Sequence, residues 1–266
     1  MMHSQSDDRS KTRAAYFNML AEMGVTKHIG SLATTDALVK GCHINADSLV
    51  LDAGCGIGLT PCYLTRTYGC RVVGVDITPK MIVRAQDEAE RRNVGDRVQW
   101  AVADAQALPF AAGSFDAVMV ESVSVFFDDP ALGFREYARV TKPGGYVGVT
   151  ESTWLEAPME DVDAFFDTLG GTAKTYEAWM ALMAQAGLAD VTGYAQRADV
   201  REEACGRLKR FGCRGLLRAL VRAVPAILGN RDARRVLKQA MAAAPARVLV
   251  LMGYGVYVGR KPSTLV

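Results

Sequence analysis

The fold is decided by residues 50–58, which read Val50-Leu51-Asp52-Ala53-Gly54-Cys55-Gly56-Ile57-Gly58. The apolar start of this stretch predicts a buried strand. The three glycines predict a sharp turn in which a ligand can approach the main chain without meeting a Cβ atom. A helix is expected to begin just beyond, near Thr60-Pro61, and its free N–H groups would face a carboxylate or a phosphate.

The same alternation of strand and helix continues along the chain from residue 48. Short β-rich runs and amphipathic segments follow one another, which predicts a parallel sheet covered on both faces. The expected strands are residues 48–53, 71–75, 98–103, 115–121, 146–151, 189–196 and 248–257. The expected helices are residues 59–68, 79–92, 130–140 and 173–186, the third of them stopped by Lys142-Pro143-Gly144-Gly145. The fold class is therefore α/β, with a doubly wound, mostly parallel sheet of seven strands.

Two helical segments flank this core. Residues 1–45, helical in pattern from residue 14, are expected to form a lid, and residues 199–246 are expected to form a basic insertion before the last strand. The core itself would then comprise residues 46–198 and 247–266. Residues 199–247 hold twelve Lys/Arg against four Asp/Glu, although the whole chain has a net charge of only +2.

Five arginines of the insertion recur at helical spacing and predict one basic stripe, namely Arg207, Arg210, Arg214, Arg218 and Arg222. Such a stripe can contact an anionic membrane or an acidic substrate tail. The plainer interpretation is a helix packed on the core with its arginines in solvent. Gly212 and Gly215 either weaken this helix or permit a kink that closes over a substrate.

Composition limits the cellular setting. Half of the residues are apolar and 23% are charged, as in an ordinary soluble globular protein. The six cysteines show neither a C-x-x-C pair nor a metal-type spacing, and the N-terminus is polar, so we expect reduced thiols, no metal and a cytoplasmic location. A membrane span is not expected, because the uncharged run at residues 248–259 is too short. An arsenic site built from Cys55, Cys62 and Cys70 is a weaker alternative to small buried thiols.

The glycine loop fits a dinucleotide poorly. The fingerprint G-x-G-x-x-G would need a third glycine at position 59, which is Leu59. Asp76, which ends the second strand 22 residues after Gly54, can accept hydrogen bonds from two ribose hydroxyls. A nucleoside with a short zwitterionic tail suits these residues better than a pyrophosphate, and an NAD-type oxidoreductase remains the less favoured reading.

Four motifs in the order found here resemble those of the Rossmann-like (class I) S-adenosylmethionine-dependent methyltransferases, over roughly residues 45–152. The resemblance implies S-adenosyl-L-methionine as cofactor and a sheet order of 3-2-1-4-5-7-6 with the last strand antiparallel. It also implies a role for each motif in cofactor binding. Asp52, Gly54, Gly56 and Gly58 would hold the methionine end, residues 73–77 with Asp76 and Ile77 the ribose, and Asp104 with Ala105 the adenine.

Within that family the sequence looks most like the small-molecule branch, which includes quinone-biosynthesis and sterol methyltransferases. The fourth strand ends in Glu121-Ser122-Val123-Ser124 and lacks the Asn/Asp-Pro-Pro-Tyr/Phe tetrapeptide of enzymes that methylate amino groups of bases. We therefore expect a small, apolar or lipid-like acceptor and no nucleic-acid partner, while the oligomeric state stays open. The alternative is a module without turnover that binds the cofactor or a membrane surface.

Four side chains are candidates for contact with the acceptor. Methyl transfer is an in-line displacement, so the protein mainly aligns donor and acceptor, and a general base is optional. Glu121 and Glu151 end the fourth and fifth strands, where open α/β sheets bind ligands. Glu121 is also placed beside the cofactor. Tyr16 and His28 lie in the lid segment and could orient or deprotonate the acceptor, or be a core tyrosine and a surface histidine.

Overall fold

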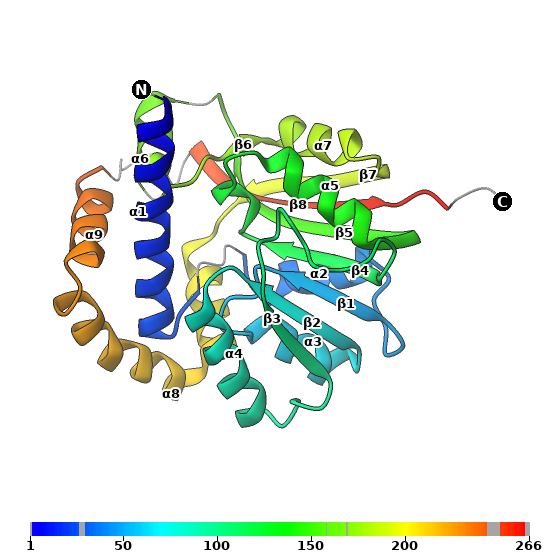
Figure 1. The fold of residues 1–266 in the computed structure, drawn as a ribbon, viewed down its shortest axis with the longest axis horizontal. Helices are drawn as coiled ribbons and strands as arrows, with labels where there is room; N and C mark the ends of the chain where they lie inside the picture. Colours follow the sequence, from blue (N-terminus) through cyan, green and yellow to red (C-terminus); the bar gives the residue numbers. More distant parts are fainter. Residues whose placement is uncertain (1, 27–29, 158, 169, 244–250, 264–266) are drawn as a thin grey trace.

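A computed structural model describes residues 2–26, 30–157, 159–168, 170–243 and 251–263, and within them an eight-stranded sheet lies at the centre of the molecule (Figure 1). The strands are β1 (Leu49–Ala53), β2 (Arg71–Asp76), β3 (Val98–Val102), β4 (Phe115–Glu121), β5 (Thr141–Trp154), β6 (Lys174–Thr175), β7 (Ala189–Arg197) and β8 (Met252–Arg260).

The sheet order confirms the expected topology. The main path runs β3-β2-β1-β4-β5-β8-β7, and the two-residue β6 pairs with β5 off this path. Strand β8, the seventh expected strand, is antiparallel to both of its neighbours, while the pairs from β3 through β5 are parallel. The carboxyl ends of β1, β2 and β4 therefore meet at one edge of the sheet, where such folds bind ligands.

Helices cover both faces because the strands bury alternate residues on opposite sides. Val50 packs in one core cluster and Leu51 in the other. The cluster around Val50 receives side chains from α2 (Leu32–Gly41), α3 (Leu59–Tyr68) and α4 (Pro79–Arg91). The cluster around Leu51 receives them from α5 (Pro130–Val140) and α7 (Tyr176–Gln185). This is the doubly wound arrangement that the sequence predicts.

Two strand boundaries differ from the expectation. Strand β5 begins at Thr141, so the segment expected to stop the helix belongs to the strand. Helix α5 ends at Val140, and Thr141 pairs with Phe115. Between the pairs Phe115–Thr141 and Ala117–Tyr146 the register shifts, because β5 has more residues than β4 over this stretch. The extra residues include Gly144, whose φ is 80°. Strand β8 begins at Met252, and the expected strand residues 248–250 lie outside the described residues.

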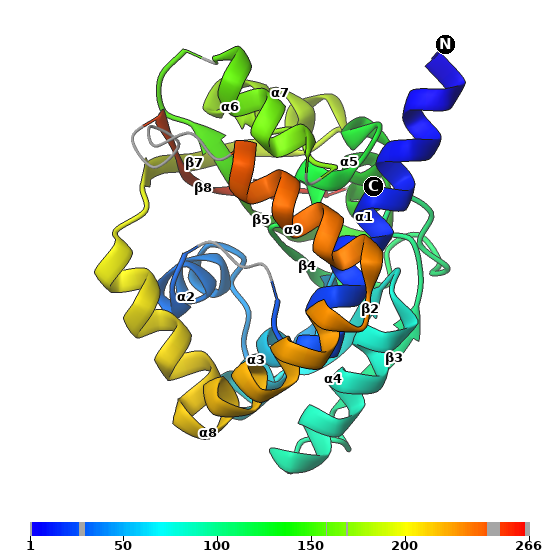
Figure 2. The same ribbon diagram turned by 90° about the vertical axis from the view of Figure 1, so that its left-hand side faces the viewer.

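The N-terminal helix and the insertion build a second layer at the ligand edge. Helix α1 (Met2–Met23) begins earlier than the sequence pattern suggests, and it lies beside α9 (Arg231–Ala243) and α8 (Val200–Leu228) (Figures 1 and 2). We call α8 and α9 together the arm. Three short elements were not expected: the 3-10 helix η1 (Ser124–Phe126), helix α6 (Glu160–Asp167) and strand β6, which occupies the start of the helix expected over residues 173–186.

The arm is kinked and turns part of its basic stripe inward. Gly212 has φ 66° and ψ 164°, which breaks the helix as the sequence allowed. The expectation of a solvated stripe is wrong for Arg210, which is only 8% exposed because the first part of α8 docks on the core. Apolar side chains of α8 lie in solvent instead, namely Leu208, Leu217, Leu220, Val221, Val224 and Leu228. None of the described helices is long and apolar enough to span a bilayer.

Candidate cofactor site

The glycine loop after β1 has the backbone that the sequence predicts. Gly54 and Gly56 have φ angles of 83° and 53°. A Cβ atom at Gly54 would lie 2.3 Å from the Val123 side chain, so only glycine fits there. Helix α3 follows at once, and its N-cap Gly58 supplies no side-chain cap, which leaves the first N–H groups of the helix available to a ligand.

Asp52 lies under this loop with an unsatisfied acceptor. Its side chain is 2% exposed, and no described donor hydrogen-bonds to its Oδ2 atom. Burial raises the pKa of Asp52, and the nearby Glu121 carboxylate raises it further, while Arg210 opposes the shift. A buried, unpaired carboxylate oxygen beside a ligand loop suits an ammonium group.

Asp76 joins the ends of β1 and β2. Its Oδ2 atom accepts from the Gly56 N–H at 3.0 Å, and its Oδ1 atom accepts from the Thr78 N–H at 2.8 Å. Burial raises the pKa of Asp76, and these two hydrogen bonds lower it. The carboxylate is thereby fixed beside the glycine loop, with further lone pairs that can accept from a ligand hydroxyl.

The segment expected to contact adenine follows β3. Asp104 accepts from the Gln106 N–H at 2.8 Å, and Ala105 is buried in the core. Ile77, which follows Asp76, is 59% exposed, so its side chain is free to cover a flat ring. Asp52, Asp76 and Asp104 thus lie at or just beyond the carboxyl ends of three neighbouring strands, β1, β2 and β3.

Glu121, at the end of β4, is the centre of a buried polar cluster. Its Oε1 atom accepts from the Thr35 hydroxyl and its Oε2 atom from the Thr60 hydroxyl, both at 2.7 Å. The Arg210 guanidinium donates to the same two hydroxyls, at 3.0 Å to Thr35 and 3.1 Å to Thr60. Burial lowers the pKa of Arg210, while Glu121 and Asp52 raise it. The cluster ties α2, α3, β4 and the arm together.

Arg210 is the site residue that the sequence pattern did not single out. It was one of five equivalent stripe residues, and its spacing alone could not show which arginine reaches the core. The signal available was a pair of acids, Asp52 and Glu121, at the ends of two expected strands with no cation near them in sequence. Buried carboxylates of this kind need a partner.

Two of the other predicted acceptor contacts lie in described elements, Tyr16 on α1 and Glu151 on β5. Burial raises the pKa of Tyr16 to about 12, and its ring packs 5.6 Å from Phe17 and 6.4 Å from Phe126, centroid to centroid. Glu151 is fully buried and accepts from the backbone N–H groups of Val123 and Ser124, where it fixes the start of η1. His28 lies outside the described residues.

The pocket beside the glycine loop is small. Its volume is about 30 Å³, and it is lined by Thr26, Asp52, the glycine loop, Glu121 and Arg210, among others. One water molecule needs roughly 10–15 Å³, so this space cannot hold an amino-acid chain. The donors and acceptors therefore fit an adenosyl amino acid in chemistry, and Thr26 or Arg210 has to shift before the methionine end can enter.

The cysteines contribute no comparable site. Four of them are buried, and burial raises the thiol pKa of Cys55 and brings that of Cys62 to about 12. Cys205 and Cys213, both on α8, are exposed. Among the described residues, no group of three or more His, Cys, Asp or Glu side chains is arranged to hold a metal ion.

Comparison with known proteins identifies the core. Residues 51–149 match the methyltransferase-domain family. Methyltransferase GfsG of Streptomyces halstedii is 32% identical over 128 residues, which is 48% of this chain and 46% of the relative. The 2-methyl-6-phytyl-1,4-hydroquinone methyltransferase of Synechocystis sp. is 39% identical over 102 residues, which is 38% of this chain and 31% of the relative. The matched region spans less than half of either relative.

The likeness in fold extends over nearly the whole chain. The crystal structure of the [4+2]-cyclase SpnF superposes with a TM-score of 0.73 and covers 95% of this chain and 94% of its own, at 21% sequence identity. At that identity the superposition establishes the fold and leaves the reaction open. Residues 51–149, which match the methyltransferase-domain family, thus lie within a chain that has a Rossmann-like fold.

Proposed function

We propose that this chain binds S-adenosylmethionine and transfers its methyl group to a small, apolar or lipid-like acceptor. One observation carries the proposal: the buried, unpaired Oδ2 atom of Asp52 lies under a positive-φ glycine loop, with Asp76 fixed beside it. Asp52 suits an amino group, the glycine loop lets a ligand approach the main chain, and Asp76 suits a ribose. A buried carboxylate oxygen without a hydrogen-bond donor costs free energy, so support of the fold alone would not account for it.

Each part of the cofactor has a residue suited to it. Asp52 would accept from the methionine amino group, and Arg210, which lines the same pocket, would pair with the methionine carboxylate. Asp76 would accept from the ribose hydroxyls. Asp104 and Ala105 would bind the adenine edge, with Ile77 against the ring face.

The polar residues around the site are better suited to orient the acceptor and to exclude water than to remove a proton. When bound, the cofactor would supply a sulfonium methyl group, and the acceptor would take it in line with the breaking S–CH3 bond, with S-adenosylhomocysteine as the leaving group. Both oxygens of Glu121 already accept from threonines, and Glu151 already accepts from two backbone N–H groups, so we assign both a positioning role. Tyr16, with its raised pKa, is a neutral phenol near pH 7 and would donate a hydrogen bond to the acceptor. His28 stays a prediction.

The surroundings of the site favour an apolar acceptor. The lid and the arm meet in a cluster that contains Met19 and Leu20 of α1, Ile57 and Met81 of the core, and the partly buried Phe211. Phe17 and Phe126 stack edge to face at 4.8 Å beside Tyr16. By its name, the Synechocystis relative acts on a hydroquinone that carries a phytyl chain. A ring with a hydrocarbon tail is therefore the first acceptor class to test.

Calorimetry with S-adenosylmethionine and S-adenosylhomocysteine tests the cofactor. Asp76→Ala should weaken binding by roughly 1–3 kcal/mol, because it removes a charged acceptor. Asp96→Ala, at an exposed turn before β3, is the matched control and should bind like the wild type. Binding of neither compound would remove the proposal. An acceptor screen with prenylated quinols, read by mass spectrometry for a gain of one methyl group, then tests turnover.

The alternative of a module without turnover gains no support from a family match to methyltransferases. Contact with an anionic membrane and the cytoplasmic location both stay predictions from sequence. The inward turn of Arg210 weakens the original argument for membrane contact, since a buried guanidinium cannot reach a lipid surface.

A further inference from the structure

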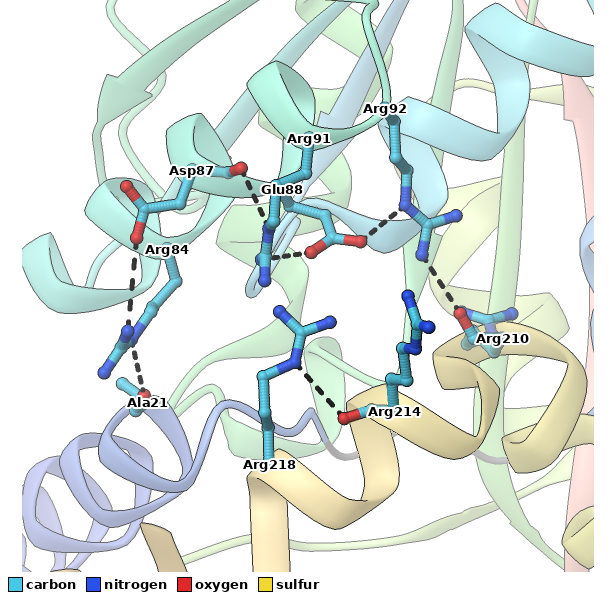
Figure 3. A network of polar contacts seen from close by, with 9 residues as sticks. All are labelled: Ala21, Arg84, Asp87, Glu88, Arg91, Arg92, Arg210, Arg214 and Arg218. Carbon is cyan, nitrogen blue, oxygen red and sulfur yellow. Dashed lines mark hydrogen bonds and ion pairs between the residues drawn. The ribbon is translucent and has the colours of Figure 1, made fainter. Parts of the chain in front are cut away.

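A second cationic site lies between α4 and the arm, away from the Glu121 cluster. Helix α4 contributes Arg84 and Arg91, its C-cap residue is Arg92, and the facing part of α8 contributes three more arginines. Figure 3 shows the two sets of side chains pointing toward one another across the gap, with Arg214 and Arg218 on the α8 side.

The carboxylates at this site are already engaged by α4. Glu88 accepts from Arg92 Nε at 2.5 Å and also pairs with Arg91, and Asp87 lies 4.0 Å from Arg84. Within the described parts of the chain, no carboxylate forms an ion pair with any α8 arginine of this site, namely Arg214, Arg218 and Arg222. The Arg218 side chain donates to the carbonyl oxygen of Arg214 at 3.2 Å. The site therefore carries more positive than negative charge.

A small cavity lies among these side chains. Its volume is about 50 Å³, and its lining includes all the arginines of the site except Arg214, together with Glu88. Ile57, Leu59 and Phe211 form its apolar wall. Since one water molecule needs roughly 10–15 Å³, the cavity has room for one compact group of a few atoms and not for a whole organic molecule.

Like charges are held close together here. Burial lowers the pKa of Arg222, and the neighbouring Arg84, Arg91 and Arg218 lower it further. The guanidinium of Arg222 also lies 2.9 Å from where a Cβ atom on Gly24 would be, so it packs against the end of α1. Arginine forks facing each other around a small space are the arrangement that binds a phosphate group through several charged hydrogen bonds.

We propose that the cavity between α4 and α8 binds a phosphate group and that this anion clamps the arm onto the core. Arg218 and Arg222 would bind it from the arm, and Arg84 and Arg91 from α4. The clamp would act on the cofactor pocket through two contacts. Arg92 donates to the Arg210 carbonyl oxygen at 3.1 Å, and Leu59 lines both cavities. The phosphate can belong to a soluble ester or to a lipid headgroup, since both present the same oxygens.

Thermal unfolding and calorimetry with inorganic phosphate and pyrophosphate test the site without cofactor or acceptor. At matched ionic strength, either anion should raise the Tm of the wild type by a few degrees relative to chloride, because it binds only the folded state. Arg218→Gln and Arg222→Gln should each lower the affinity for the anion at least tenfold. Arg218→Lys keeps the positive charge but loses the planar guanidinium group, so it should lower the affinity less. Arg201→Gln, an exposed arginine near the start of α8, should bind like the wild type.

Vesicles distinguish the two sources of phosphate. Vesicles of phosphatidylcholine with phosphatidic acid should retain the wild type and not Arg218→Gln if a lipid headgroup is the ligand. Binding of free anions with no retention on these vesicles identifies a soluble phosphate ester. Equal Tm values in phosphate and chloride together with no vesicle retention would overturn the proposal, as would equal anion affinity in Arg201→Gln and Arg218→Gln. None of these measurements uses S-adenosylmethionine, so their outcome is independent of the proposed methyl transfer.

Discussion

Asp52 shows how one residue can serve binding at the expense of stability. Its Oδ2 atom is buried and unpaired, and burial places its pKa above the ordinary value. A raised pKa means that the folded state holds the proton more tightly than the unfolded state. The stability contribution of Asp52 is therefore fully present below the pKa of the unfolded residue and is lost as the pH rises through the folded pKa.

Asp52→Asn should accordingly be more stable than the wild type at pH 7, by about 1–3 kcal/mol, and should bind S-adenosylhomocysteine more weakly. The difference in Tm between the variant and the wild type should be small below about pH 4 and should grow as the pH rises. Thermal unfolding over that pH range measures it. A variant that is less stable at every pH would show that Asp52 has a structural partner.

Replacing Arg210 should have the opposite effect and destabilise the protein, because its charge compensates buried acids. Arg210→Met leaves Glu121 and Asp52 without their cation and should cost roughly 3–5 kcal/mol in the free energy of unfolding, measured in urea. Arg207→Met, at an exposed position one turn earlier, should change it by less than about 0.5 kcal/mol. Adding Glu121→Gln to Arg210→Met should restore part of the loss. Strict additivity of the two changes would contradict a direct coupling.

At the scale of elements, the kink of α8 decides which arginines face the core. Gly212 has a backbone conformation that is open almost only to glycine, and no atom lies within 4 Å of the place where its Cβ would be. The kink is therefore set by the backbone of this residue and not by crowding around it. Arg210 lies before the kink in the Glu121 cluster, and Arg218 lies after it beside α4.

Gly212→Ala should cost about 1–3 kcal/mol, because alanine is strained in this conformation. If the strain is relieved by straightening α8, the positions of Arg210 and Arg218 change together, so cofactor affinity should fall as well. Gly95→Ala, at an open turn without positive φ, is the control and should be close to neutral. Chemical unfolding and calorimetry of both variants measure the two effects. Unchanged stability in Gly212→Ala would mean that the kink tolerates a side chain.

At the scale of the molecule, the core was predictable and the second layer was not. Strand order and glycine loop follow from local motifs, in which the residues that matter are neighbours in sequence. The partners of Glu121 come instead from Thr35, Thr60 and Arg210, which lie 86, 61 and 89 positions away. Periodicity shows that α8 is amphipathic, but only long-range packing decides that Arg210 turns inward while several leucines lie in solvent. Helix α6 escaped notice because eight residues give too short a pattern.

Entry of the cofactor should move the second layer more than the sheet. The pocket of about 30 Å³ is closed by Thr26 and Arg210, which belong to the segment after α1 and to the arm. Hydrogen–deuterium exchange with and without S-adenosylhomocysteine should therefore change most in residues 16–26 and 203–218, beyond the glycine loop itself. The amides of β4 and β5 serve as the internal reference. A change confined to residues 52–60 would mean that the cofactor enters without displacing the arm.

The distribution of thiols gives a practical route to watching that movement. Four cysteines are enclosed by the core, whereas Cys205 and Cys213 are accessible on α8 and stand on either side of Arg210. A maleimide dye or a nitroxide would consequently attach at these two positions of the natural sequence without engineered labelling sites. Paired probes there would report bending between the two halves of the helix in real time.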